Sequence, residues 1–248
     1  MFNQPIPPIT KNLLIINGLF FLATIVFESS GIYLKGILGA FYPESVNFQG
    51  WQIITHMFMH GDFSHILFNM FALWMFGSAV ESTLGGKKFL TLYFVAGLGS
   101  FILFNFTNYI QIEQLKPIVE ASGVNIPDFI KSLVFTPEGR YAMPQTTDLE
   151  ATKELALNYV TPMVGASGAI YGLLVGFGVL FPNAKLALLF FPVPVKAKYF
   201  IPVLIAIEFY MGLQNYAWNP VAHFAHIGGA VIGFIMVRQW KKSLNNFF

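Results

Sequence analysis

The chain has 248 residues, of which 55% are hydrophobic and only 10% charged, whereas about a quarter of the residues in a soluble domain are charged. This composition argues against a water-soluble globule. A formal net charge of +2 without a concentrated basic face also argues against a nucleic-acid partner. Because the chain has no cysteine, disulfides, thiolate metal sites and cysteine nucleophiles are excluded together.

The charged residues, 14 basic and 12 acidic, are clustered along the chain. Five stretches contain no Asp, Glu, Lys or Arg: 12–27, 63–80, 89–112, 155–184 and 209–237. A membrane-spanning helix needs roughly 20 mostly apolar residues. Pro, Gly and charged residues mark where the apolar runs end. These runs predict six spans near 13–34, 63–82, 88–110, 163–181, 199–216 and 221–240. The predicted fold class is an all-α polytopic membrane protein, with one domain over residues 1–248 embedded in the lipid bilayer.

Charge placement predicts an orientation for these spans. An even number of spans puts both termini on one side, and cytoplasmic termini would place nine basic residues inside and five outside. The N-terminus, MFNQPIPPITK, is not typical of a transit peptide or a cleaved signal. We therefore predict an integral multi-pass protein of the plasma (inner) membrane of a bacterium, with its termini in the cytoplasm.

Two segments between the spans have their own character. Residues 35–61 interleave aromatic and polar side chains, so we expect them to lie in the outer membrane interface. Residues 111–160 carry seven acidic and four basic residues, too many for a span. They are interpreted as one external loop, with a helix of its own around 148–160.

All five histidines fall in two short stretches. His56, His60 and His65 lie in THMFMHGDFSHILFN, and His223 and His226 in NPVAHFAHIGG. The simplest interpretation of His56 and His60 is that they are polar anchors at the interface. His65 and His226 lie inside charge-free spans, where an ionisable group usually faces a cavity or a partner.

Four polar residues on three predicted spans lie at a similar depth below the membrane surface. Counted from the outer ends of their helices, Ser167 and His226 lie about 7 to 9 Å deep, and His65 and Asn69 about 5 to 10 Å deep. Small residues repeat every four positions in spans four and six: Gly168, Gly172 and Gly176, and Ala225, Gly229 and Gly233. Such seams let membrane helices approach closely. Ser167 and His226 are therefore predicted to be neighbours.

This pairing would suit nucleophilic catalysis, because a serine hydroxyl needs a base and neutral imidazole is the natural one near pH 7. Glu208, about 15 Å from the inner end of its span, is expected to lie too deep to be a partner of His226. Tyr171, four residues after Ser167, is the candidate to stack on the imidazole, or else it is ordinary core packing. His65 and Asn69, four residues apart, offer donors for an oxyanion beside the Ser167 backbone, although such an Asn can also simply bond another helix.

In combination, four motifs resemble those of the rhomboid intramembrane serine proteases. They are W51-x4-HMFMHGDFSHILFN69, E81-x3-G85-x3-F89, GASGAIYG at 165–172 and AHIGG at 225–229. The resemblance implies a six-helix rhomboid-like bundle with Ser167 as nucleophile and His226 as base. It further implies oxyanion contacts from His65, Asn69 and the Ser167 backbone, a serine framed by Gly165 and Gly168, and Tyr171 packed on His226.

The resemblance also implies features outside the reacting residues. The loop around Trp51 would be embedded in the membrane, and residues 214–222 would cap a water-filled site. Many family members carry Arg where this chain has Gln52. Family substrates imply a preference for small residues at the cleavage position and for helix-breaking character nearby.

The predicted function is that of an intramembrane serine endopeptidase that cuts transmembrane protein substrates in or near their spans with a Ser-His dyad, without a metal or another cofactor. One alternative is a metal site or metal transporter built from the five histidines, although HExxH is absent and GASG would be unexplained. Another is a catalytically inactive relative that binds membrane clients.

Overall fold

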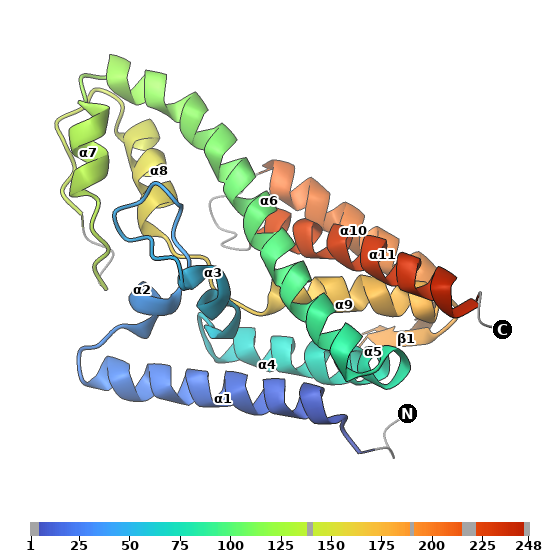
Figure 1. Ribbon diagram of the computed structural model, residues 1–248. Coiled ribbons are helices and arrows are strands. Elements are labelled where there is room, and N and C mark those ends of the chain that lie inside the picture. The colour runs from blue at the N-terminus through green and yellow to red at the C-terminus, as the bar shows by residue number, and fades with distance from the viewer. Residues whose placement is uncertain (1–4, 138–140, 189–190, 215–221, 246–248) are drawn as a thin grey trace.

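A computed structural model describes residues 5–137, 141–188, 191–214 and 222–245. Six long helical segments form the bundle, which confirms the predicted all-α class (Figure 1). They are α1 (Pro8–Ser29), the continuous run α4 (Phe63–Ala72), η2 (Leu73–Gly77) and α5 (Ser78–Leu84), then α6 (Gly86–Ala121), α9 (Ser167–Leu180), α10 (Ala197–Gln214) and α11 (His223–Asn245). The first turn of α1 and the last turn of α11 lie at the same end of the bundle.

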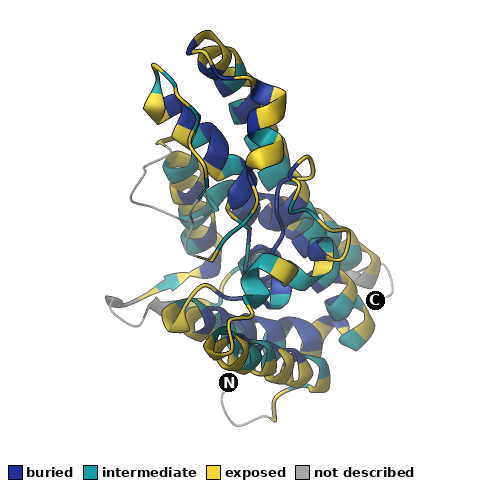
Figure 2. Ribbon diagram, turned by 90° about the vertical axis from the view of Figure 1, so that its left-hand side faces the viewer, coloured by how far each residue is buried: buried dark blue, intermediate teal, exposed yellow. Residues whose placement is uncertain are grey.

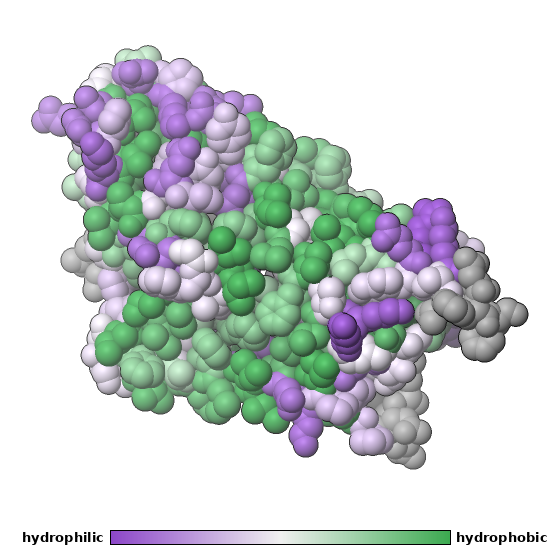
Figure 3. Space-filling model, in the orientation of Figure 1, coloured by the Kyte–Doolittle hydropathy of each residue, from purple (hydrophilic) through white to green (hydrophobic). Residues whose placement is uncertain are grey.

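Surface polarity identifies the bundle as a membrane domain. The α1 helix buries Asn17 completely and leaves Leu22 59% exposed, the reverse of the pattern in a water-soluble helix. Buried residues gather where the helices meet, and exposed ones lie on their outer sides (Figure 2). An apolar surface separates two polar ends (Figure 3). Three segments, Pro8–Ser29, Phe63–Leu84 and Gly86–Ala121, are long and apolar enough to cross a bilayer by themselves.

The segment before α4 folds without spanning, as two short helices, α2 (Leu34–Leu38) and α3 (Gln52–Thr55), and a 3-10 turn, η1 (His56–Phe58). Gln52 is fully buried and organises this segment. Its side-chain oxygen accepts from the backbone N–H groups of Phe41 and Gln49, and its amide donates to the carbonyls of Ile37 and Asn47. Gln52 therefore satisfies four backbone groups of this loop.

Residues 111–160 do not form the single loop that was predicted. The α6 helix continues to Ala121, and α7 (Ile126–Ser132) and α8 (Leu149–Val160) follow it at the end of the bundle opposite the last turn of α11. The extension is helical because its apolar residues recur at helical spacing and pack on the inner face of α8. This small core includes Ile112, Leu115, Val119, Leu155 and Tyr159. The predicted helix around 148–160 corresponds to α8.

A β-hairpin, unpredicted from the sequence, joins α9 to α10. Strands β1 (Lys185–Leu188) and β2 (Phe191–Lys196) are antiparallel, with Lys185 opposite Lys196 and Leu186 opposite Val195. The prolines of β2 argue against a strand when the sequence is considered alone, because proline has no N–H to donate a hydrogen bond to a neighbouring strand. A two-stranded ribbon tolerates them, since each strand has one unpaired edge.

The prediction that spans four and six pack through small residues is confirmed. Gly229 of α11 lies against the carbonyl of Gly168 in α9, and Gly233 lies against Gly172 in the same way. A side chain at either α11 position would overlap the α9 backbone. This contact fixes the first turn of α11 against the first turn of α9, where Ser167 is the first residue.

We expect Gly229→Ala to lower the free energy of unfolding by about 1–3 kcal/mol, the usual cost of overpacking a close contact. The added methyl group would meet the Gly168 carbonyl. Gly18→Ala is the matched control, because no atom lies within 4 Å of the position its methyl group would take. Unfolding of both variants in detergent micelles gives the comparison, and equal stability would show that α9 and α11 do not need this close approach.

Candidate active site

Ser167 is held in place by residues 161–166, the strap that connects α8 to α9. Met163 and Ala40 exchange two backbone hydrogen bonds, 2.8 and 2.9 Å long, and the Gly165 N–H donates to the His56 carbonyl at 3.0 Å. Gly165 has a φ of +126°, which L side chains rarely adopt. The strap therefore ties the segment before α4 to the residues just before Ser167.

Ser167 and His226 are hydrogen-bonded. His226 Nε2 lies 2.9 Å from Ser167 Oγ, and His226 is 8% exposed in the first turn of α11. The Tyr171 ring stacks on the imidazole with centroids 4.2 Å apart and planes 8° from parallel. The structure thus brings together the three side chains that the sequence placed on spans four and six.

Glu208 corrects the sequence analysis, which set it too deep to meet His226. Its Oε2 lies 3.0 Å from His226 Nδ1 and 2.6 Å from His223 Nδ1, and its Oε1 accepts from the Tyr171 hydroxyl. The error was to measure depth from the inner end of the helix. Glu208 is six residues before the C-terminal end of α10 at Gln214, or about 9 Å from that end, which matches the depth predicted for His226.

The carboxylate gives the imidazole a defined tautomer. An ionised carboxylate only accepts hydrogen bonds, so the ring proton of His226 belongs on Nδ1. Nε2 then presents its lone pair to the Ser167 hydroxyl, 2.9 Å away. Ser167, His226 and Glu208 therefore have the connectivity of a Ser-His-carboxylate triad.

His65 and Asn69 lie on α4 beside the strap. The Gly61 N–H donates to His65 Nδ1 at 3.3 Å, which leaves the ring proton on Nε2. A side chain at Gly165 would come within 2.8 Å of that Nε2 and 3.6 Å of Ser167 Oγ, so the space between them is open only because residue 165 is glycine. The Asn69 side chain is 7% exposed, and its Nδ2 is a buried donor that has no hydrogen-bond partner among the described residues.

Asp62 positions His65 by capping α4. Its carboxylate accepts from the His65 backbone N–H at 2.8 Å, at the point where the helix has unpaired donors. Hydrogen bonds from the Ser64 hydroxyl and the His65 N–H hold the pKa of Asp62 below its ordinary value. The cap therefore fixes the start of the helix that carries His65 and Asn69.

The remaining histidines do not join one metal cluster. His56 is 1% exposed, its Nδ1 bonds the Gln52 carbonyl, and burial lowers its pKa to about 4, so this ring is neutral. His60 is buried with its ring edge-on to His65. Over the described part of the chain, three metal-type ligand atoms gather within 4.8 Å only at Glu208, His223 and His226. The predicted cap, 214–222, lies almost wholly outside the described residues.

Comparison with known proteins gives the family. Residues 47–240 match the Rhomboid domain family. The chain is 29% identical over 214 residues to an uncharacterized mitochondrial rhomboid protein of Schizosaccharomyces pombe, covering 77% of this chain and 52% of that one. It is 26% identical over 247 residues to rhomboid protease AarA of Providencia stuartii, covering 92% and 70% of the two chains.

A third relative is rhomboid protease GlpG of Haemophilus influenzae, 31% identical over 164 residues, or 61% of this chain and 79% of that one. The match spans about half the length of the S. pombe relative. The family match covers most of the chain and includes all four motifs and every side chain of the candidate site. The chain belongs to the rhomboid family of membrane proteins.

Proposed function

We propose that this chain is an intramembrane serine endopeptidase that cuts transmembrane protein substrates within or near their spans. The observation that carries the proposal is the 2.9 Å contact between Ser167 Oγ and His226 Nε2, inside a bundle whose outer surface is apolar. The family relationship supports a protease, since relatives include two named rhomboid proteases. The small-residue preference implied by the family resemblance is part of this proposal.

Acylation begins at Ser167. His226 Nε2 takes the hydroxyl proton while Oγ attacks the scissile carbonyl, and the imidazolium then gives that proton to the leaving amine. Glu208 accepts the Nδ1–H bond throughout, which keeps the ring in the productive tautomer and stabilises its positive charge. A water molecule next attacks the acyl-enzyme, with His226 as the base again.

The oxyanion forms between α4 and the start of α9. Its donors would be His65 Nε2–H, Asn69 Nδ2 and the Ser167 N–H, which the first turn of α9 leaves without an intrahelical partner. Asn69 supports this role most strongly, because a buried donor without a partner is costly unless a ligand satisfies it. The three donors come from two helices, α4 and α9, and the Gly165–His56 hydrogen bond ties the residues just before α9 to the segment just before α4.

We expect Asn69→Ala to lower kcat by about 10²- to 10³-fold with little change in KM, the usual effect of losing one oxyanion donor. Stability should hardly change, because the Asn69 amide donor has no partner in the structure. Asn105→Ala on α6 is the control, since its amide donates only to the Phe101 carbonyl one turn away. Steady-state kinetics with wild-type rates for Asn69→Ala would assign this residue to packing.

The proposed setting is a bacterial plasma membrane, with the whole chain acting as one six-span domain and both termini in the cytoplasm. The excess of basic residues toward the end that holds the termini supports this orientation. Single cysteines at Lys88 and Lys198 are then expected to resist a membrane-impermeant thiol reagent in intact cells, while one at Lys153 reacts. Reaction at Lys198 together with protection at Lys153 would reverse the orientation.

Reconstituted protein tests the activity. In liposomes with a single-span substrate, we expect two fragments whose masses place the cut within or beside the span, in EDTA as well as without it. Cuts only in water-exposed loops would contradict the intramembrane assignment. Loss of activity in EDTA, restored by metal, would favour the metal alternative, and binding of the substrate without any cut would favour the inactive relative.

A further inference from the structure

The proposed catalytic base, His226, and its partner Glu208 have a third neighbour, His223, that catalysis does not require. His223 lies one helical turn before His226 on α11, and both Nδ1 atoms meet the same oxygen of Glu208, at 2.6 and 3.0 Å. One atom from each of the three residues lies within 4.8 Å of the other two. Two imidazoles and one carboxylate form a ligand set that zinc uses widely, with water in the fourth position.

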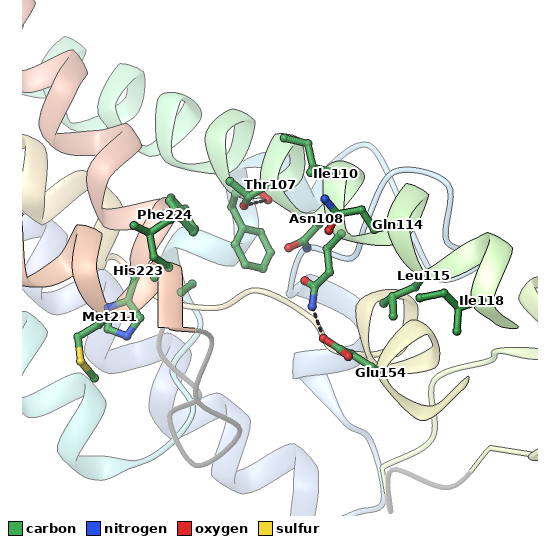
Figure 4. Close-up of a pocket in the computed structure, with 15 residues that line it drawn as sticks. Thr107, Asn108, Ile110, Gln114, Leu115, Ile118, Glu154, Met211, His223 and Phe224 are labelled. Atoms are coloured by element: carbon green, nitrogen blue, oxygen red, sulfur yellow. Dashed lines mark hydrogen bonds between the residues drawn. The ribbon is translucent and has the colours of Figure 1, made fainter. Parts of the chain in front are cut away.

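A cavity reaches this group at His223, one of its three members. It has a volume of about 680 Å³ and lies between the outer half of α6, α8 and the facing ends of α10 and α11. In Figure 4, His223 and Met211 lie on one side of it, and Asn108, Gln114 and Glu154 on the other. The lining is mostly apolar, but these amide and carboxylate side chains offer polar contacts to a hydrated cation, and the Glu154 carboxylate contributes negative charge.

We propose that Glu208, His223 and His226 bind a divalent transition-metal ion such as Zn²⁺, and that this ion switches the protease off. The proposal rests on the proposed function, because it concerns the control of the same base. Ligand atoms of a tetrahedral zinc site lie about 3.3 Å apart when each is about 2.0 Å from the metal. The three side chains therefore need only small shifts from the arrangement without metal.

Inhibition follows from the two nitrogens of His226. In the catalytic tautomer, Nδ1 carries the proton and donates to Glu208, while Nε2 faces Ser167 Oγ. A metal ion on Nδ1 needs that lone pair, so the ring proton must move to Nε2. Nε2 then becomes a donor to the serine and cannot take its proton. The metal also occupies Glu208, which removes the group that keeps the ring in the catalytic tautomer.

The first experiment measures binding without relying on activity. Untagged Ser167→Ala protein in detergent is titrated with ZnCl2 by calorimetry, and with Co²⁺ for its visible absorption bands. We expect one ion per chain, with tetrahedral cobalt bands, and an affinity at least about tenfold weaker when His223→Gln is added. His60→Gln is the matched control, because His60 is a buried histidine that is not one of the three ligands, and the variant should bind zinc as Ser167→Ala does.

The second experiment measures control of cleavage. Zn²⁺ should inhibit the wild-type protein, EDTA should restore the rate, and Mg²⁺ should have no effect because it prefers oxygen ligands. His223→Gln should raise the inhibitory zinc concentration by the same factor as the dissociation constant, each variant being compared with its own metal-free rate. Zinc binding or inhibition that His223→Gln does not weaken would overturn the proposal. A protein that never cleaves but binds zinc through His223 would instead overturn the proposed function and leave the metal site standing.

Discussion

Ser167→Ala and His226→Ala are each expected to abolish cleavage, with kcat lower by up to about 10⁶-fold, as for residues that act as one unit. The double variant should be no worse than either single one, because the proton transfer needs both Oγ and Nε2 at 2.9 Å. Cleavage of a reconstituted single-span substrate measures the effect, and unfolding in detergent shows whether each variant remains folded.

Ser82→Ala is the matched control for the serine, since Ser82 is exposed on α5, and it should cleave at the wild-type rate. Additive losses in the double variant would mean that Ser167 and His226 act in separate steps. A folded Ser167→Ala protein that still cuts at the same bond would remove Ser167 from the mechanism.

Glu208→Gln is expected to lower kcat by about 10²- to 10⁴-fold while KM changes little. The amide keeps the shape of the side chain but loses the charge that stabilises the imidazolium, and it no longer imposes the Nδ1–H tautomer. Glu208→Asp keeps the charge with a shorter reach, so we expect it to retain more activity than Glu208→Gln. A purely structural role would give the opposite order or a parallel loss of stability.

Two controls separate charge from packing. Glu113→Gln removes a carboxylate from the exposed side of α6 and should leave kcat unchanged. Tyr171→Phe removes one hydrogen bond to Glu208 but keeps the ring that stacks on His226, so it should cost less than Glu208→Gln. A Glu208→Gln protein that is folded and fully active would show that Ser167 and His226 work as a dyad without Glu208.

The sequence predicted the bundle well because the bilayer imposes a strict rule on it. Every span must be long and apolar, so apolar runs bounded by Pro, Gly and charged residues located the six helices. Depth and small-residue spacing then placed Ser167 beside His226, since both follow from the rise per residue of a helix. The helical extension of α6 and the helix α7 escaped prediction because their apolar residues pack on each other at the polar end of the molecule.

Glu208 shows why depth must be counted from the correct end. Counting from Lys198 near the start of α10 predicts a depth beyond the reach of His226, but α10 runs opposite to α9 and α11. Counting from Gln214 gives the level of Ser167 and His226. His223 was missed as its neighbour, because the position of a side chain around α11 depends on where that helix begins.

Covalent labelling measures directly whether His226 activates Ser167. A fluorophosphonate reacts with an activated serine, and peptide mass spectrometry locates the adduct. We predict one adduct on Ser167 in the wild-type protein, none in folded His226→Ala, and slower formation in folded Glu208→Gln than in Glu208→Asp. An adduct on another serine, or equal labelling of Ser167 in the wild-type and His226→Ala proteins, would show that His226 does not activate Ser167.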